Sequence, residues 1–448
     1  MKRVAVILLS LLILATTQGI HIYAEPGEEG ELTAEEILQA EKDAIYQLEI
    51  QSNKLNNWPV GPQTYAQSSI VMDMDSGAIL YAKNVDEKLY PASITKLVTA
   101  LVALENAELT DRVYVTEEAV SFLEWNYAQI GLRAGEEISM SEALHATLLK
   151  SANEAAYAVG ANTGEGYEWF LEEMNRWVEK VGARNSHFTN THGLHDEQHY
   201  TTTRDMALLG SALRDYPEAF DIMQTTYSTI PPTNVDEEEK HMSQNHKMLL
   251  PNHEKYYEYA TGGKTGFTNE AGTTLVTFAS KDGINLVCVT MKSWANNVYD
   301  DTTHLLEYGF QNFEKVFIQK EYLPKDVNLV EDAGYVMLPV GITLQDLESE
   351  VIRDVVDESR GELTYTYEGQ EVGRMQVSVA TIEEEQQEAE EIAQMEAEET
   401  QTGSKNILVW IGRIAIGIIV LFVLLLLWVA RKKRKERKRK KRRARRRR

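Results

Sequence analysis

The sequence predicts an α+β (mixed α/β) domain whose sheet is flanked by helices, followed by a small all-β domain and a C-terminal transmembrane helix. Strand-like runs near residues 68–82 and 272–292 enclose a long helical region, and this order favours a fold in which late strands pair beside early ones. Short strand-like runs recur after Leu323. A final apolar run, 407–430, precedes a basic tail and predicts the membrane span.

Two segments precede the predicted folded domain. Residues 1–24 combine two basic residues at positions 2 and 3 with the apolar run 4–15, which is the pattern of a secretory signal peptide. An uncleaved anchor is the alternative, and either would carry the following residues across a membrane. Residues 25–62 are acidic and helix-prone as far as Pro59, so we expect an acidic lead-in helix without chemistry.

A hairpin is expected at the start of the folded domain. The runs 68–73 and 78–82 have strand character and are joined by an Asp-Ser-Gly turn at 75–77. Apolar residues from Ile94 onward then recur at helical spacing. This spacing places Ser93 in the first turn of a buried helix.

The same periodicity predicts further helices and two late strands. The single cysteine, Cys288, lies in an apolar strand-like run, so we expect it to be buried and to form no disulfide within the chain. Together these elements form a predicted domain over 63–317. Its expected later elements are helices at 141–160, 167–181, 203–213 and 300–317, and strands at 272–280 and 284–292.

Beyond this domain the composition changes. Short strands predict a small β domain over 318–381, and the Glu-, Gln- and Ala-rich stretch 382–406 predicts an exposed acidic spacer. The run 407–430 is long enough to cross a hydrocarbon core of about 30 Å. The tail 431–448 is almost entirely Lys and Arg, which predicts a cytoplasmic C-terminus and an extracytoplasmic main part. A nucleic-acid-binding tail is the alternative.

Charge is distributed unevenly along the chain. The tail holds 16 of the 45 basic residues and two more lie at positions 2 and 3, so 27 basic residues remain against 68 acidic ones over 25–430, a net charge of −41. A surface of this charge repels nucleic acids and other anionic polymers. We therefore expect no nucleic-acid partner for the exported part.

Three short motifs could support catalysis, and the first is Ser93-Ile94-Thr95-Lys96. A serine and a lysine three positions apart share one helix face, with β carbons about 5–6 Å apart. A serine hydroxyl becomes an effective nucleophile when a neighbouring base takes its proton. Lysine can act as that base if burial and nearby charge lower its pKa. Alone, this pair occurs by chance in most proteins.

The other two motifs offer polar groups that could complete a site. Ser151 and Asn153 could relay a proton and hold a substrate amide, although a polar helix turn is the simpler interpretation. Lys264-Thr265-Gly266 follows two further glycines, which would let a peptide backbone approach a strand edge while the lysine and threonine bind a carboxylate. Alone, this motif could be any turn that enters a strand.

Together the motifs match, in order, the Ser-x-x-Lys, Ser/Asn and Lys-Thr-Gly elements of penicillin-binding proteins and class A β-lactamases. The sequence resembles the low-molecular-mass penicillin-binding proteins, specifically the serine D-alanyl-D-alanine carboxypeptidases. The resemblance implies a serine penicillin-recognising domain over 63–317 and extends to about residue 381. Further matching segments are 75–77, 90–92, 188–194, 199–202 and Gly263.

The resemblance implies an enzyme that removes the terminal D-alanine from peptidoglycan pentapeptide stems and is acylated by β-lactam antibiotics. It implies that Ser93 is the acylated nucleophile, Lys96 its base, and Ser151 the group that passes a proton to the departing D-alanine. The implied substrate-binding residues are Asn153 for the peptide amide, Lys264, Thr265 and Gly266 for the carboxylate end, and Phe267, whose backbone N–H would complete an oxyanion hole with that of Ser93.

Some features depart from the family pattern or leave alternatives. Ala152 stands where the family usually has glycine, and the small β domain is short. A β-lactamase or endopeptidase of the same superfamily, or a catalytically silent cell-wall binding protein, is the alternative function. No cofactor and no metal is expected, with zinc as the alternative, because the family loop needs no metal although four histidines crowd there: His187, His192, His195 and His199.

Overall fold

The computed structural model divides the described chain into two compact units. One unit comprises the residues up to Arg353 with Arg360–Ser378, and the other comprises Asp354–Ser359 with the residues from Val379 on. The described residues are 33–325, 327–330, 334–354, 356–357, 359–380, 410–411, 413–416, 418–425, 428 and 431–432.

The predicted terminal segments lie wholly or partly outside these residues. The signal peptide, 1–24, and the acidic spacer, 382–406, fall outside them, and the span 407–430 and the tail 431–448 are described only in part. Where the span is described, its residues are helical. Within the described residues, no helix is long and apolar enough to cross a membrane.

A five-stranded antiparallel sheet organises the first unit. Its strands are β1 (Ser68–Asp73), β2 (Ile79–Lys83), β7 (Ala260–Thr268), β8 (Gly272–Lys281) and β9 (Ile284–Ser293). They lie in the order β2-β1-β9-β8-β7. The early strand β1 pairs with the late strand β9, with Val71 opposite the fully buried Cys288. The predicted pairing of late strands beside early ones is thus confirmed.

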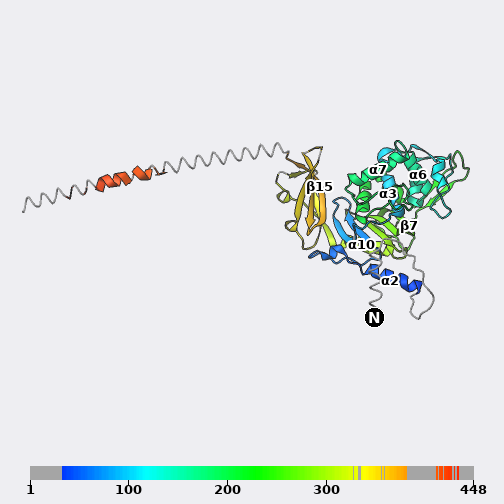
Figure 1. Ribbon diagram of the computed structural model, residues 1–448, viewed down its shortest axis with the longest axis horizontal. Coiled ribbons are helices and arrows are strands. Elements are labelled where there is room, and N and C mark those ends of the chain that lie inside the picture. The colour runs from blue at the N-terminus through cyan, green and yellow to red at the C-terminus, as the bar shows by residue number, and fades with distance from the viewer. Residues whose placement is uncertain are drawn as a thin grey trace, which may run out of the picture. The chain divides into compact units, whose positions relative to one another are not determined.

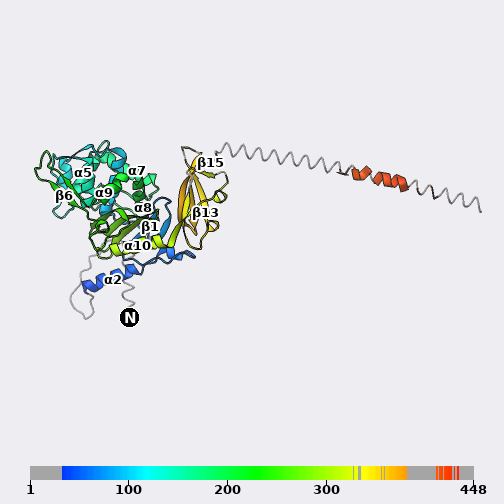
Figure 2. The same ribbon diagram turned by 180° about the vertical axis from the view of Figure 1, so that it is seen from behind.

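Helices cover both faces of this sheet. Leu286 and Val287 are neighbours in β9, so their side chains point to opposite faces. A β carbon added at Gly309 would contact Leu286, and one added at Gly210 would contact Val287. Hence α10 (Val298–Asn312) packs on one face and α8 (Thr203–Ser211) on the other, and Figures 1 and 2 show α10 across the sheet from the helical cluster.

The hydrophobic core lies between the sheet and the layer that contains α8. It includes Val287, Val289 and Met291 of β9. Two two-stranded sheets accompany the helices. The remaining elements of this domain are α3 (Thr95–Asn106), α4 (Glu117–Ser121), α5 (Met140–His145), α6 (Asn153–Ala161), α7 (Tyr167–Lys180) and α9 (Pro217–Gln224), with β3 (Arg112–Tyr114) paired to β4 (Glu137–Ser139) and β5 (Tyr227–Ile230) paired to β6 (Lys240–Ser243).

The described part of the acidic lead-in, from residue 33 on, contains the α-helix α2 (Ala34–Tyr46) and a 3₁₀ helix, Gln51–Lys54. The α-helix begins at Thr33, whose side chain forms a capping box with Glu36. None of its residues is buried. At its end, the carbonyl of Ile45 accepts a hydrogen bond of 2.9 Å from the buried Lys83 amine, which ties the helix to β2.

The continuous helix expected over 141–160 is wrong. After α5, a π-helical segment, Ala146–Lys150, ends at Ser151, which has a left-handed backbone with φ +66°, and α6 begins only at Asn153. Contacts from distant loops satisfy the freed backbone groups: the Asn153 N–H donates to Ala128 O at 2.9 Å, and Leu149 O accepts from Asn245 N at 3.1 Å. Helical periodicity could not reveal this break, because it depends on those distant partners.

Among the described residues, the small β domain has two strands more than the four expected from the sequence, and it begins earlier. The helix expected over 300–317 ends at Asn312, because the next five residues form β10, which pairs with β12 and sets Phe317 opposite Tyr335. The two added strands are β10 and β13, and exposed charged residues hide the strand character of β13. The elements are β10 (Phe313–Phe317), β11 (Val327–Leu329), β12 (Tyr335–Pro339), β13 (Glu348–Arg353), β14 (Arg360–Tyr367) and β15 (Gln370–Val379), and a four-stranded sheet has the order β11-β15-β14-β13.

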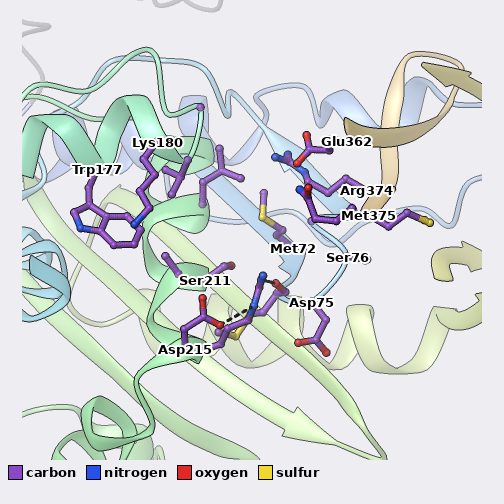
Figure 3. A pocket seen from close by; sticks show the side chains of 18 of the residues that line it. Met72, Asp75, Ser76, Trp177, Lys180, Ser211, Asp215, Glu362, Arg374 and Met375 are labelled. Carbon is purple, nitrogen blue, oxygen red and sulfur yellow. Dashed lines mark hydrogen bonds and ion pairs between the residues drawn. The ribbon is translucent and has the colours of Figure 1, made fainter. Parts of the chain in front are cut away.

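The Asp-Ser-Gly turn of the first hairpin contacts the small β domain. It thereby joins the domain of the five-stranded sheet to the small β domain within the first unit. Asp73 Oδ2 accepts hydrogen bonds from the Ser76 hydroxyl at 2.6 Å and from the Tyr335 hydroxyl of β12 at 2.8 Å. The Arg374 N–H of β15 donates to Ser76 O at 2.7 Å. Figure 3 shows the pocket beside this joint, which is lined by Asp75 and Ser76 of the turn and by Glu362 and Arg374 of the small β domain.

We expect Tyr335→Phe to lower the free energy of unfolding by about 1–3 kcal/mol, because it removes a donor from a buried carboxylate. Asp73 is fully buried, and burial raises its pKa. Urea denaturation measures the change, with Tyr114→Phe, at a half-exposed tyrosine, as the matched control. Equal stability of the two variants would contradict a structural role for the Tyr335 hydroxyl.

Candidate active site

The predicted nucleophile and base lie together at the start of α3. Ser93 belongs to a 3₁₀ turn, Ala92–Ile94, that runs directly into the helix. Lys96 follows one turn later and is fully buried, with its Nζ 3.1 Å from Ser93 Oγ. The two groups are therefore within direct proton-transfer distance.

Two carbonyl oxygens orient the Lys96 amine. Its Nζ donates to Asn153 Oδ1 at 2.7 Å and to the main-chain oxygen of His192 at 2.6 Å. A neutral amine has two N–H groups and one lone pair, and these two acceptors take both N–H groups. The lone pair then faces the third neighbour, the Ser93 hydroxyl, which can donate to it.

Burial favours this neutral form. The pKa of Lys96 lies well below its ordinary value, mainly because burial penalises the ammonium and further because the Lys264 ammonium is nearby, whereas Glu154 opposes the shift. Since Lys264 influences this pKa, the Lys-Thr-Gly motif shares one electrostatic environment with the Ser-Lys pair. The neutral amine of Lys96 is therefore more favoured than that of an exposed lysine.

Ser151 and Asn153 enter the site from the break between α5 and α6. Both are almost fully buried. Asn153 touches Lys96 directly through its side-chain oxygen. Among the described residues, the Ser151 hydroxyl has no hydrogen bond to Ser93 or Lys96, so the structure brings Asn153, but not Ser151, into contact with the Ser-Lys pair.

The Lys-Thr-Gly motif lies on β7, the edge strand of the sheet. The Lys264 amine is buried and donates to Thr265 O at 2.9 Å, and burial lowers its pKa to about 7. Phe267 is about two thirds exposed. Its candidate contribution to the oxyanion hole is its backbone N–H. A buried lysine at a strand edge can attract a substrate carboxylate.

Gly266 sets the distance between β7 and the nucleophile. A β carbon added there would lie 2.8 Å from the Ser93 nitrogen and would also overlap Thr274 Oγ1. The Thr274 hydroxyl donates to Pro91 O at 2.9 Å, which fixes the chain just before the nucleophile. Only glycine therefore lets β7 approach the Ser93 backbone so closely.

We expect Gly266→Ala to slow acylation by a penicillin roughly tenfold, because the strand must move away from Ser93. The rate constant of acylation, measured with a fluorescent penicillin, tests this. Gly262→Ala on the same strand is the matched control, since its β carbon would meet only side-chain atoms, none closer than 3.0 Å. An unchanged rate for Gly266→Ala would contradict the close approach.

Two contributors to the site were absent from the sequence prediction. The main-chain oxygen of His192 holds Lys96 from a position 96 residues along the chain. Glu154 is fully buried, and its carboxylate accepts the N–H groups of Ile130 and Gly131 at 2.7 and 3.1 Å, anchoring a loop beside Asn153. One indication of the Glu154 contacts was present in the sequence, because an acidic residue directly follows Asn153.

The crowded histidines have contacts of other kinds. His192 stacks on Phe122, His195 packs edge-on against Tyr90, and His199 bonds to Thr95. In the part of the chain that the structure describes, no group of three or more His, Cys, Asp or Glu residues could hold a metal ion.

Comparison with known proteins agrees with this geometry. A family model described as D-alanyl-D-alanine carboxypeptidase matches residues 56–294, more than half of the chain. The chain belongs to this family. The resemblance to low-molecular-mass penicillin-binding proteins is confirmed, and so is the penicillin-recognising α+β fold.

Curated members of the family match over part of their length. The chain is 31% identical over 255 residues to D-alanyl-D-alanine carboxypeptidase DacF of Bacillus subtilis, covering 56% of this chain and 63% of that protein. It is 32% identical over 261 residues to DacA of Haemophilus influenzae, covering 56% and 64%. The chain thus spans slightly less than two thirds of these carboxypeptidases.

Two similar solved structures are covered almost completely. Penicillin binding protein 5 from Haemophilus influenzae matches with a TM-score of 0.55 and 25% identity, over 72% of this chain and 98% of that chain. The Streptomyces K15 DD-transpeptidase matches with a TM-score of 0.53 and 25% identity, over 56% and 100%. Both likenesses agree with the family membership.

Proposed function

We propose that the protein is a serine D-alanyl-D-alanine carboxypeptidase that shortens peptidoglycan pentapeptide stems and is acylated by penicillins. The observation that carries the proposal is the Ser93–Lys96 contact of 3.1 Å, with both N–H groups of a neutral amine occupied by carbonyl oxygens. Family membership supports the same reaction.

In the first half of the reaction, Lys96 takes the Ser93 proton as Oγ forms a bond to the penultimate D-alanine carbonyl carbon. Backbone N–H groups of Ser93 and Phe267 receive the developing oxyanion, where each such donor is worth about 2.7–4 kcal/mol. The peptide C–N bond then breaks, and the proton from Lys96 reaches the departing D-alanine nitrogen through Ser151.

Hydrolysis of the ester completes the cycle. Water gives a proton to Lys96 while its oxygen attacks the acyl carbon, and the proton returns to Ser93 Oγ as the ester bond breaks. Asn153 binds the peptide amide, and Lys264 with Thr265 holds the terminal carboxylate. A β-lactam has an equivalent carboxylate and a reactive amide. We therefore expect it to acylate Ser93 as the substrate does and to remain bound as the acyl-enzyme.

Two assays test this proposal. A fluorescent penicillin should label the wild-type protein stably, fail to label Ser93→Ala, and label the exposed control Ser349→Ala normally. Purified pentapeptide muropeptides should lose the mass of one alanine. Rapid turnover of the drug would instead identify a β-lactamase, and absence of both labelling and mass loss would indicate a silent binding protein.

An endopeptidase is the second candidate, because the chain is also 31% identical over 232 residues to a D-alanyl-D-alanine endopeptidase of Pseudomonas aeruginosa, covering 51% of this chain and 72% of that protein. Cross-linked muropeptide dimers distinguish the two. Cleavage of dimers in preference to pentapeptide monomers would favour the endopeptidase.

The proposal includes anchoring to the outer face of a cell membrane by the segment 407–430. Its described large apolar side chains are exposed, from 48% at Val423 to 68% at Leu421, and a bilayer would cover them. The basic tail 431–448 would remain in the cytoplasm. Alkaline carbonate extraction of membranes from cells that produce the full chain should leave it in the membrane, and its release would contradict the anchor.

A further inference from the structure

The residue before the nucleophile has a backbone conformation that needs support. Ala92 has φ +51°, a left-handed value that residues with a β carbon rarely adopt. Ala92 and Ser93 share one peptide unit, whose carbonyl oxygen and N–H point in opposite directions because the unit is planar and trans. Whatever holds Ala92 O therefore also aims the Ser93 N–H.

Ala92 O accepts the Thr95 backbone N–H and also stands at the end of a chain of three further hydrogen bonds. The Thr95 hydroxyl donates to Ala92 O at 2.8 Å, and Thr95 Oγ1 lies 2.9 Å from His199 Nε2. On the far side of the imidazole, the Thr189 N–H donates to His199 Nδ1 at 3.0 Å. The chain thus runs from the 189 loop through one histidine to the peptide unit of the nucleophile.

The directions of these bonds follow from the chemistry of a neutral imidazole, which has one donor and one acceptor nitrogen. Nδ1 accepts from a backbone N–H, so Nε2 carries the hydrogen and donates to Thr95 Oγ1. The Thr95 proton is then free to point at Ala92 O. His199 exposes only 2% of its surface, and burial lowers its pKa to about 3, so it stays neutral.

The opposite side of the peptide unit faces β7. The Ser93 nitrogen is the backbone atom that a β carbon at Gly266 would approach to 2.8 Å. Behind the unit, Gly193 packs so closely that a β carbon there would overlap Ala92 O. The Ser93 N–H is thus directed away from the 189–193 loop and toward the strand that contributes the Phe267 N–H.

We propose that His199 is a positioning residue which, through Thr95 and Ala92 O, aims the Ser93 N–H into the oxyanion hole. This inference rests on the proposed acyl transfer at Ser93. The oxyanion forms only in the transition state, so losing this orientation should slow acylation while leaving ground-state binding unchanged. A merely structural role would not separate the two quantities.

We call the hydrogen-bond chain from Thr189 through His199 and Thr95 to Ala92 O the relay. Four variants test it by stopped-flow measurement of the acylation rate constant and of the dissociation constant of the initial penicillin complex. His199→Phe and Thr95→Val, which remove the donors, should slow acylation about 10- to 100-fold with an unchanged dissociation constant. His199→Gln and Thr95→Ser, which keep a donor and a hydroxyl, should stay within about threefold of wild type. His187→Phe, at a histidine outside the relay, is the matched control.

A boronic acid that forms a tetrahedral adduct with Ser93 provides a second readout, since its affinity should fall by the same factor as the acylation rate. Unchanged acylation in both His199→Phe and Thr95→Val would overturn the inference, as would equal losses in binding and rate. If the wild-type protein neither binds penicillin covalently nor cleaves pentapeptide, the proposed function itself fails.

Nitrogen NMR of histidine-labelled protein tests the relay independently of activity and of folding in the variants. We expect His199 to have its proton on Nε2 between pH 5 and 8. A proton on Nδ1, or a doubly protonated ring in this range, would overturn the inference, because Thr95 would then lose the donor that directs its hydroxyl.

Discussion

Lys96→Arg should lower kcat/KM for pentapeptide cleavage by about 10²- to 10⁴-fold, the usual contribution of a general base. Arginine retains a positive charge at every relevant pH, so it cannot accept the Ser93 proton. It would also place a permanent charge at a fully buried position, where burial lowers the pKa of the native amine. Acylation by a fluorescent penicillin should fall by a similar factor.

The same substitution at an exposed lysine, Lys88→Arg, is the control for this prediction and should leave activity unchanged. Circular dichroism of both variants checks that they fold. Near-native acylation by a folded Lys96→Arg protein would rule out Lys96 as the base and leave the Ser93 contact without its proposed role.

Lys264→Gln should lower kcat/KM about 10- to 150-fold, because a hydrogen bond to a charged group contributes about 1.5–3 kcal/mol. It should also change the pH profile. In the free enzyme the pKa of Lys264 is lowered to about 7, so the ammonium that attracts the substrate carboxylate is lost as the pH rises above this value. Wild-type kcat/KM should therefore decline on the alkaline side, and this decline should disappear in Lys264→Gln.

The acidic side of the profile gives a separate check. The Lys264 charge lowers the pKa of Lys96, so its removal should raise that pKa and move the acidic limb to higher pH. Activity measured from pH 5 to 10 would reveal both changes. A penicillin methyl ester, which lacks the carboxylate, should lose little in the variant, and an equal loss for acid and ester would contradict carboxylate binding by Lys264.

Much of the catalytic domain could be predicted because its elements have strong local patterns. The runs that became β1, β8 and β9 are apolar and bounded by turn residues, and their pairing follows from the antiparallel order. The helix after Ser93 was equally clear, since its buried positions recur at helical spacing. In these regions local preference and tertiary packing agree.

The prediction failed where distant partners override local preference. The residues around Ser151 look helical, yet loop backbones at Ala128 and Asn245 bond to the groups that a continuous helix would use. Similarly, residues after Asn312 leave the helix because a strand of the small β domain pairs with them. Neither partner lies within one helical turn in the sequence, so periodicity alone could not identify it.

The sequence by itself determined which groups are available for chemistry: a serine and a lysine one turn apart, an amide, and a second lysine beside glycines at a strand edge. Only the tertiary structure decided that these groups form a site. Burial lowers the pKa of Lys96, and the carbonyls of His192 and Asn153 direct its lone pair at Ser93. Desolvation and hydrogen-bond direction depend on residues far apart in the chain, so they exist only after the chain has folded.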